Sequence, residues 1–276
     1  MILSEQKNHE KRQPAVAGRF YPAEREALVR EVEAHIDRNV KKSRALGIVA
    51  PHAGFMYSGD VAGAVYSRIE IPDTVILIGP NHTGHGEAVA VMTEGTWSMP
   101  MGDIPIDREL AEAICEETVM AKQDSSAHQF EHSLETQLPF LQYFKKGFQI
   151  VPICLMRMKI SSCKELSEGI VRAVTRLDKP VLLVASSDMT HYESHDRAGI
   201  KDRMAITCIQ KRDPLGLFET VQSEKITMCG VNPVTVMLYC SESLGAKEAE
   251  LVKYMTSGEV SGDMEKVVGY AGLIIK

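Results

Sequence analysis

Four short runs of branched apolar residues constrain the fold of this chain most strongly. They are ALGIVA (45–50), DTVILIG (73–79), FQIVPICLM (148–156) and PVLLVASSD (180–188). Their apolar residues are consecutive rather than alternating, which predicts strands that are buried on both faces. Stretches with helical spacing separate them. The pattern therefore predicts an α/β fold with a central, mainly parallel or mixed sheet and helices on both faces.

The helical stretches are predicted from apolar residues that recur every three or four positions. They cover 23–39, 107–117, 132–146, 162–178, 196–213 and 232–246. Pro139 should either kink the third of these helices or mark its start. Residues 87–97 resemble a β-hairpin or edge ribbon, and 250–259 and 266–276 are expected to be closing strands.

The domain organisation is expected to be simple. Neither a linker nor an internal repeat divides the 276 residues, so we expect one domain over 14–276 after a flexible N-terminal tail over 1–13. A net charge of −6 argues against general nucleic-acid binding. With no signal-like leader, no apolar run of about 18 residues and no C-x-x-C pair, we expect a cytoplasmic protein with reduced thiols.

Polar side chains follow three of the predicted strands. His52 follows the first, Asn81 and His82 follow the second, and Asp188 and His191 follow the fourth. In open α/β sheets, ligands bind at the carboxyl ends of the strands. These side chains are therefore expected to meet in one crevice.

Two further segments supply residues of the same kinds. Cys229 lies just before a predicted helix, and HQFEHSLE (128–135) contains His128, Glu131 and His132. Each has an ordinary structural interpretation: a solvated turn histidine, a small buried cysteine, or the first turn of a helix. His128 and His132 are four residues apart, as metal ligands on one helix face are, but they lack the H-E-x-x-H pattern.

Taken together, these residues indicate a metal site. His52, His82 and Cys229 would leave positions open for water or substrate, and such a ligand set accepts iron, copper or zinc. Asp188 and His191 are the candidate proton-transfer pair. His85 and His195 are expected to be a loop residue and a surface residue.

The motifs, in their order, resemble the Memo family over nearly the whole chain. They are PAVAGRFYP (14–22), APHAGFMYSG (50–59), GPNHTG (79–84), EHSLE (131–135), SSDMTHY (186–192) and CGVNP (229–233). This family is similar in fold to the class III extradiol dioxygenases, which use non-haem iron. The resemblance implies a metal site on His52, His82 and Cys229, and catalytic Asp188 and His191.

The resemblance also implies surroundings and partners. Residues that line the cleft or support the ligands from behind would be Tyr57, Asn81, Glu131 and His132. A cysteine stands where the dioxygenases have a carboxylate, which favours copper or zinc more than a carboxylate does, although iron(II) is the expected metal. Microbial relatives imply a radical-SAM protein and a small conserved protein as partners, with an unknown small molecule or peptide as ligand.

Three functions follow as hypotheses. The first is a metal-dependent redox protein or dioxygenase-like enzyme of unknown substrate. The second is a non-catalytic module that binds a peptide or an anion in the same cleft. The third is a zinc-assisted hydrolase.

Overall fold

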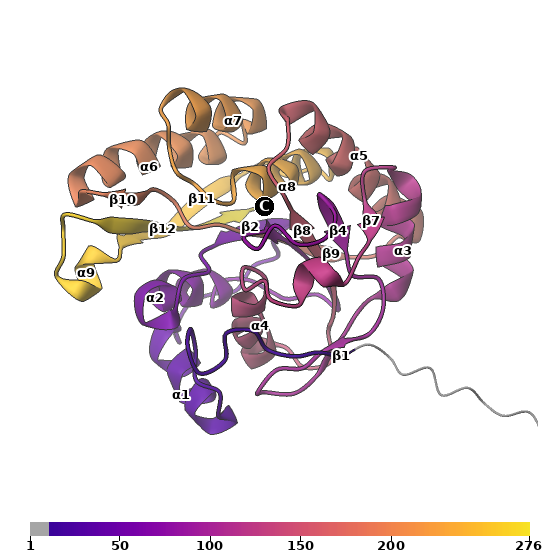
Figure 1. Cartoon of the computed structure of the whole chain (residues 1–276), viewed down its shortest axis with the longest axis horizontal. Helices are drawn as coiled ribbons and strands as arrows, with labels where there is room; N and C mark the ends of the chain where they lie inside the picture. Colours follow the sequence, from indigo (N-terminus) through magenta and orange to yellow (C-terminus); the bar gives the residue numbers. More distant parts are fainter. Residues whose placement is uncertain (1–10) are drawn as a thin grey trace, which may run out of the picture.

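The computed structural model describes residues 11–276, in which a nine-stranded mixed sheet forms the centre (Figure 1). Its strands run in the order β10-β12-β2-β9-β3-β8-β4-β7, and β11 also pairs with β12. Their bounds are β2 Gly47–Ala50, β3 Thr74–Pro80, β4 Val89–Val91, β7 Lys122–Gln123, β8 Gln149–Leu155, β9 Val181–Ser186, β10 His191–Glu193, β11 Ala249–Thr256 and β12 Val267–Ile275.

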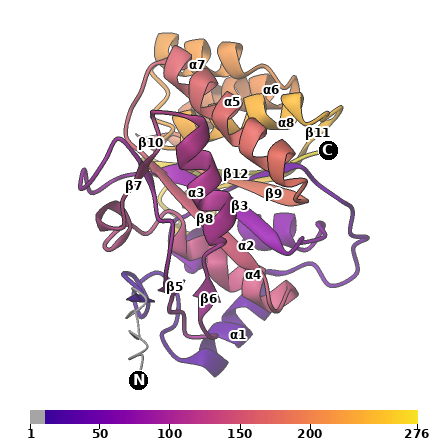
Figure 2. The same cartoon turned by 90° about the vertical axis from the view of Figure 1, so that its right-hand side faces the viewer.

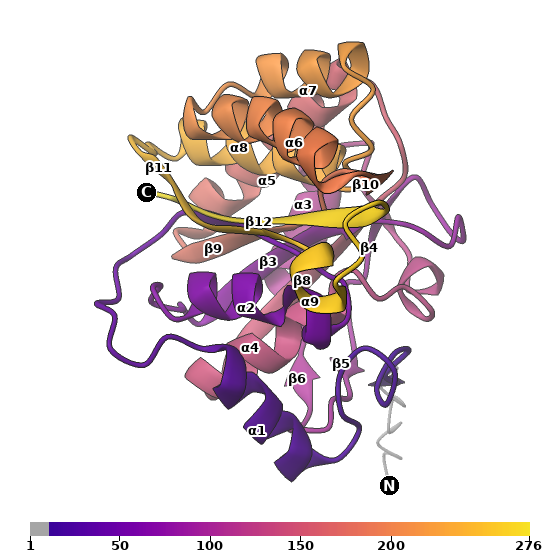
Figure 3. The same cartoon turned by 90° about the vertical axis from the view of Figure 1, so that its left-hand side faces the viewer.

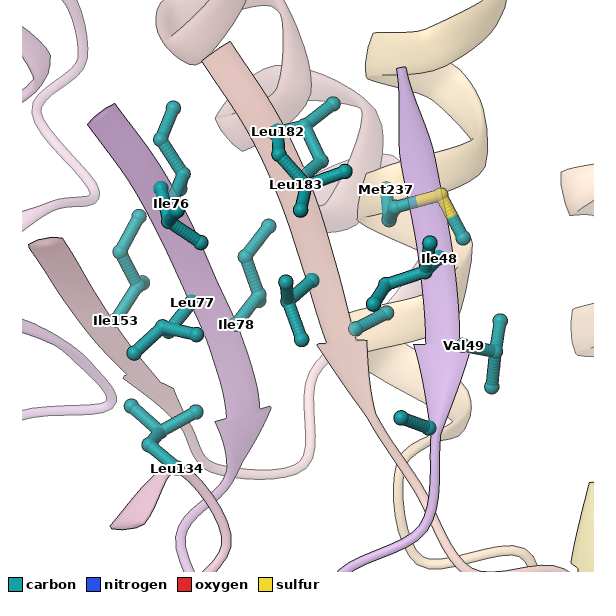
Figure 4. Close-up of a cluster of buried hydrophobic side chains, with 14 of the residues drawn as sticks. Ile48, Val49, Ile76, Leu77, Ile78, Leu134, Ile153, Leu182, Leu183 and Met237 are labelled. Carbon is teal, nitrogen blue, oxygen red and sulfur yellow. The ribbon is translucent and has the colours of Figure 1, made fainter. Parts of the chain in front are cut away.

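The four strands predicted from apolar runs form the parallel middle of this sheet. β2, β9, β3 and β8 are parallel neighbours, whereas β12 joins β2 antiparallel and β4 joins β8 antiparallel. Burial on both faces is complete at Ile76, Leu77 and Leu183, and Met237 packs against the sheet from a covering helix (Figure 4). The predicted fold class, a single α/β unit with a mainly parallel mixed sheet, is confirmed.

Helices cover both faces of the sheet (Figure 3). One layer holds α1 Arg25–His35, α2 Phe55–Tyr66 and α4 Leu138–Phe144. The opposite layer holds α3 Arg108–Glu117, α5 Ile160–Leu177, α6 His195–Gln210, α7 Pro214–Ser223 and α8 Val231–Ser243. A short α9, Gly258–Ser261, lies between β11 and β12. Figure 2 shows that the layer with α5 to α8 and the layer with α1, α2 and α4 lie on opposite sides of the strands.

Three α-helices were not predicted: α2, α7 and the four-residue α9, which begins at the end of the strand predicted over 250–259. The two longer ones were missed for physical reasons. α2 is buried on almost all sides, so its sequence shows no amphipathic period. A Cβ at Gly63 would lie 2.1 Å from the His35 carbonyl oxygen, so only glycine permits α1 to approach α2 this closely. α7 is short, and its signals are local: Pro214 occupies the first turn and the Asp213 side chain caps the start.

The predicted ribbon over residues 87–97 is wrong as a hairpin. β4 belongs to the central sheet, whereas β5 (Thr96–Trp97) belongs to a separate three-stranded sheet with β1 (Lys11–Arg12) and β6 (Ile104–Pro105). Pro139 lies in the first turn of α4 and therefore marks its start rather than a kink.

The N-terminal segment is part of the fold from Lys11 onward, so the predicted tail over 1–13 is too long; its residues 1–10 lie outside the described residues. Arg12 is buried and forms an ion pair with Glu135, which is also buried. Glu135 accepts further hydrogen bonds from the Ala15 and Val16 amides, at 2.7 and 3.0 Å, and from the Tyr21 hydroxyl at 2.5 Å. These contacts fasten the PAVAGRFYP segment to the EHSLE segment.

Candidate metal centre

The residues predicted for the site gather at the carboxyl edge of the parallel strands. His52 lies two residues beyond β2, and His82 lies two residues beyond β3. Asp188 follows β9, and Cys229 precedes α8. Since parallel strands end at the same edge, the topology alone brings residues so distant in sequence together.

Three imidazoles form the centre of this cluster. His52, His82 and His132 each offer a ring nitrogen, and these nitrogens all lie within 4.8 Å of one another. The ring centroids are 5.1 Å apart for His52 and His82 and 4.9 Å apart for His82 and His132. Imidazole is the commonest metal-binding side chain, so this group could hold a metal ion.

Cys229 lies against the same cluster. Its Sγ is 3.3 Å from Nε2 of His52 and accepts a hydrogen bond from the Asp188 amide at 3.2 Å. Burial raises the pKa of the thiol, and the nearby Asp188 carboxylate raises it further. The following residue, Gly230, permits this approach, because a Cβ there would lie 2.4 Å from the Ser186 carbonyl oxygen.

A buried hydrogen-bond chain fixes the tautomer of His52. Ser186 Oγ donates to the Ser133 carbonyl at 2.6 Å and accepts from Gln137 Nε2 at 3.0 Å. The Gln137 orientation is set by Tyr66, whose hydroxyl donates to Oε1 at 2.9 Å. With its proton used, Ser186 Oγ can only accept at 2.8 Å from Nδ1 of His52. The proton of His52 is therefore on Nδ1, and Nε2 presents a lone pair to the site.

Glu131 performs the same task for His82. Its Oε1 lies 3.0 Å from His82 Nδ1, and its carboxylate also accepts the amides of His82, His132 and Ser133, at 2.5, 2.8 and 2.8 Å. A carboxylate behind an imidazole raises the basicity of the outer nitrogen and holds the ring orientation. The prediction placed Glu131 either in the cleft wall or behind the ligands, and the structure places it behind the His82 ring.

The charges of the cluster are mutually dependent. Burial opposes ionisation of Glu131, but its hydrogen bond to His82 and the nearby charge outweigh this and lower its pKa to about 2. Burial opposes protonation of His82 as well, yet Glu131 raises the pKa of that ring. Burial and the neighbouring rings hold the pKa of His52 well below its ordinary value. His52 is therefore neutral at pH 7, as a metal ligand must be.

Asp188 and His191 occupy two different places in the site. The Asp188 carboxylate accepts the His52 amide at 2.8 Å, and its other oxygen is 4.0 Å from His52 Nε2. Burial raises the pKa of Asp188. His191 donates from Nδ1 to the Thr227 carbonyl at 3.0 Å, which leaves Nε2 as its acceptor. The adjoining Tyr192 has a left-handed φ of 60°, a strained conformation of the kind that concentrates at functional sites.

A cleft of about 500 Å³ opens beside the cluster and reaches from Asn81 and His82 to Cys229. Asn81 shapes its edge: Oδ1 accepts from the Thr83 and Gly84 amides, both at 3.0 Å, and Nδ2 donates to the His85 carbonyl at 2.7 Å. Tyr57 was expected to line the cleft, but it lies half-exposed in α2 and outside the residues that line it.

The remaining histidines lie outside the cluster. His128 is fully buried near Trp97 and hydrogen-bonds the Ala90 carbonyl at 3.2 Å, so it shares no site with His132 despite the four-residue spacing. His85 is exposed in the loop, as expected. His195 is only partly exposed, because its Nδ1 pairs with Thr256 Oγ1 at 2.9 Å.

Sequence reasoning missed Ser186 and Gln137. A serine and a glutamine carry no local pattern, and their role comes from hydrogen bonds across the sheet edge. Their one signal is position, since Ser186 ends a predicted strand. His132 was assigned to the wall rather than to the ligand group for a similar reason, because no strand end precedes it.

Across residues 11–276, every helix is too short or too polar to cross a bilayer.

Comparison with known proteins reports the same kind of molecule. The model of the Memo-like protein family matches residues 12–274. A MEMO1 family protein of Methanopyrus kandleri is 42% identical over 96% of this chain and 99% of its own, and one of Methanosarcina barkeri is 44% identical over 96% and 100%. An uncharacterized protein of Escherichia coli K12 shares the fold, with a TM-score of 0.57 and 12% identity over 84% of this chain and all of its own.

The family match and the relatives span nearly the whole described chain, including every residue of the cluster. Residue by residue, the predicted motifs fall inside the matched range. The chain therefore belongs to the Memo-like protein family.

Proposed function

We propose that this chain is a metal-dependent redox protein, dioxygenase-like in its use of two histidines and one anionic ligand. His52, His82 and Cys229 would bind the ion, with iron(II) as the expected metal and copper or zinc as alternatives. The observation that carries the proposal is the orientation of the two imidazoles. His52 holds its Nδ1 proton in a buried hydrogen bond to Ser186 and has Nε2 3.3 Å from the Cys229 sulfur. His82 directs Nδ1 to Glu131 in a partly buried hydrogen bond, and ring nitrogens of the two histidines lie within 4.8 Å of each other.

The donor set fits such a metal. A thiolate with two neutral imidazoles suits iron, copper and zinc. The His52 ring lies between Ser186 on one side and Cys229 on the other, at 2.8 and 3.3 Å, so its orientation is set before any ion arrives. A bound cation would also lower the pKa of the Cys229 thiol, which burial otherwise raises.

The neighbouring residues supply proton handling and positioning. A bound metal would supply the redox or Lewis-acid chemistry. Asp188 lies 4.0 Å from the outer nitrogen of His52, and burial keeps its pKa raised, so it can hold a proton within the site. His191 keeps Nε2 free as an acceptor because Nδ1 donates to Thr227. Together they form an acid and a base on one side of the cluster.

His132 is the alternative third ligand. Its ring nitrogen lies within 4.8 Å of ring nitrogens of His52 and His82, so the three histidines could hold an ion without Cys229. An all-nitrogen set favours zinc chemistry and would support the hydrolase hypothesis. The two ligand sets differ in one residue, so a pair of variants distinguishes them.

The test is metal analysis after anaerobic purification, followed by an oxygen-uptake screen. The wild-type protein should retain about one iron or copper per chain, Cys229→Ser should lose metal affinity by about 10-fold or more, and Cys208→Ser should not. Cys208 is a matched control because it is half-buried between α6 and α7 and contacts Thr220. Wild-type protein without iron, copper or zinc would refute the proposal. Metal loss in His132→Ala but not in Cys229→Ser would identify His132, rather than Cys229, as the third ligand.

A further inference from the structure

The cleft beside the cluster carries positive charge, although the chain as a whole is acidic. Arg157 and Lys225 line it, and its lining contains neither aspartate nor glutamate. The chain has a net charge of −6, so this absence of carboxylates runs against the composition. Among residues 11–276, the structure places no carboxylate oxygen within 4.0 Å of either cationic group. Both charges are thus available to a ligand.

The Arg157 segment is held in place by a buried side chain from the CGVNP motif. Asn232 is 5% exposed and forms hydrogen bonds with both the amide and the carbonyl of Met158, the residue that follows Arg157. Its Nδ2 donates to the Met158 carbonyl at 3.0 Å, and its Oδ1 accepts the Met158 amide at 3.4 Å. The segment after β8 that carries Arg157 is therefore fixed to the first turn of α8, which follows Cys229 closely in the sequence.

Lys225 is held by its backbone. Its φ of 51° is left-handed, a conformation that L-residues rarely adopt without local support. That support consists of two hydrogen bonds: the Lys225 amide donates to the Gln222 carbonyl at 3.3 Å, and Lys201 Nζ donates to the Lys225 carbonyl at 3.3 Å. The fold thus fixes the start of the lysine side chain at the edge of the cleft.

Part of the lining is apolar, and the uncapped start of α8 adds to the positive field. Phe218, Val221 and Ile226 are buried and supply one wall. Val231 is the first residue of α8, whose N-cap residue Gly230 has no side chain to satisfy the free amides. Helix N-termini attract anions, here as a third contribution beside two cations. A volume of about 500 Å³ suits a small molecule.

We propose that the cleft binds a small molecule with an apolar body and a terminal carboxylate or phosphate. The anionic group pairs with Arg157 and Lys225, and the apolar body packs on the Phe218 wall, which leads to His82 and Cys229. This inference rests on the proposed function, since it names the class of substrate that the metal site would act on. It also identifies Arg157 and Lys225 as specificity-determining residues.

The test compares four probes of one shape by isothermal titration calorimetry: phenylacetate, phenyl phosphate, neutral phenylacetamide and cationic 2-phenylethylamine. At least one anion should bind the wild-type protein about 10-fold or more tightly than the amide, since charge-assisted bonds are about twice as strong as neutral ones. The tighter of the two anions identifies carboxylate or phosphate as the terminal group. The amine should bind weakest.

The variants locate the effect. Arg157→Gln and Lys225→Gln should each weaken anion binding by about 3- to 10-fold, in line with partly exposed charges, and leave amide binding unchanged. Arg44→Gln is the matched control, because Arg44 is exposed just before β2, at the opposite edge of the sheet. Equal affinities for anion and amide, or an anion preference that survives in the double variant, would overturn the inference.

Metal content measured on the same samples separates this inference from the proposed function. Arg157→Gln and Lys225→Gln should hold as much metal as the wild-type protein. If the protein binds metal but shows no anion preference, the inference about the cleft is contradicted and the proposed function is not. If the protein holds no metal but prefers the anions, and this preference depends on Arg157 and Lys225, only the proposed function is contradicted.

Discussion

Replacing Ser186 with alanine should weaken metal binding without touching a ligand. Ser186 Oγ is the acceptor for His52 Nδ1–H, and the residue is fully buried, so water cannot replace it. Leaving that donor unsatisfied costs about 1–3 kcal/mol. The ring can avoid this penalty by moving its proton to Nε2, which then points an N–H rather than a lone pair at Cys229. Binding a metal must reverse the change, so affinity should fall about 10- to 100-fold.

Two measurements check this prediction. Chelator competition gives the metal affinity, and nitrogen chemical shifts of the metal-free, labelled protein report which nitrogen of His52 carries the proton. Ser167→Ala is the matched control, because Ser167 is also buried but its hydroxyl bonds only to the Lys164 carbonyl within α5. The metal affinity of this variant should stay within about 2-fold of the wild-type value. If Ser186→Ala kept both the wild-type affinity and the Nδ1 proton, the hydrogen-bond chain would not control the tautomer.

Two further predictions concern stability and are read by urea denaturation. Arg12→Ala should lower the free energy of unfolding by about 3–5 kcal/mol, because it leaves the Glu135 charge buried without its cation. Lys11→Ala breaks only an exposed ion pair with Asp103 and should change the free energy of unfolding by less than about 1 kcal/mol. Equal effects of the two variants would contradict the assignment of Arg12 to the core. The pKa of Glu131 is lowered in the folded state to about 2, so its contribution is present above about pH 4.5 and is lost as the pH falls toward 2. It amounts to about 3 kcal/mol; metal-free Glu131→Gln should lack this part of the acid destabilisation, and parallel pH curves for the two proteins would count against it.

The central sheet could be predicted because its signal is local. Ile76 and Leu183 lie in runs that are apolar at consecutive positions, and such runs have few uses other than a strand buried on both faces. α2 carried no such signal, since a helix buried on almost all sides shows no clear amphipathic stripe. Arg12 was missed because a charged residue near a polar terminus resembles a tail, and its partner Glu135 lies 123 residues away.

The candidate site was predictable where topology decided it and unpredictable where packing did. His52 and His82 meet because strand ends share an edge, and that rule needs only the order of elements. Cys229 contacts His52 from the segment before α8. His132 lies in an irregular segment before α4, and sequence spacing does not predict where the side chains of such a segment lie. The roles of Ser186 and Gln137 depend on hydrogen-bond partners that are distant in the sequence, a relation that no periodicity encodes.

The antiparallel pairing of β12 with β2 has a consequence for how the chain reaches this structure during synthesis. Every candidate ligand, from His52 to Cys229, leaves the ribosome before residues 267–275 do. Until then β2, which carries His52, is an open edge of apolar backbone, and such edges pair readily with other chains. A chain truncated before Val267 would keep the complete ligand set yet expose that edge, so its first failure should be aggregation rather than loss of metal affinity.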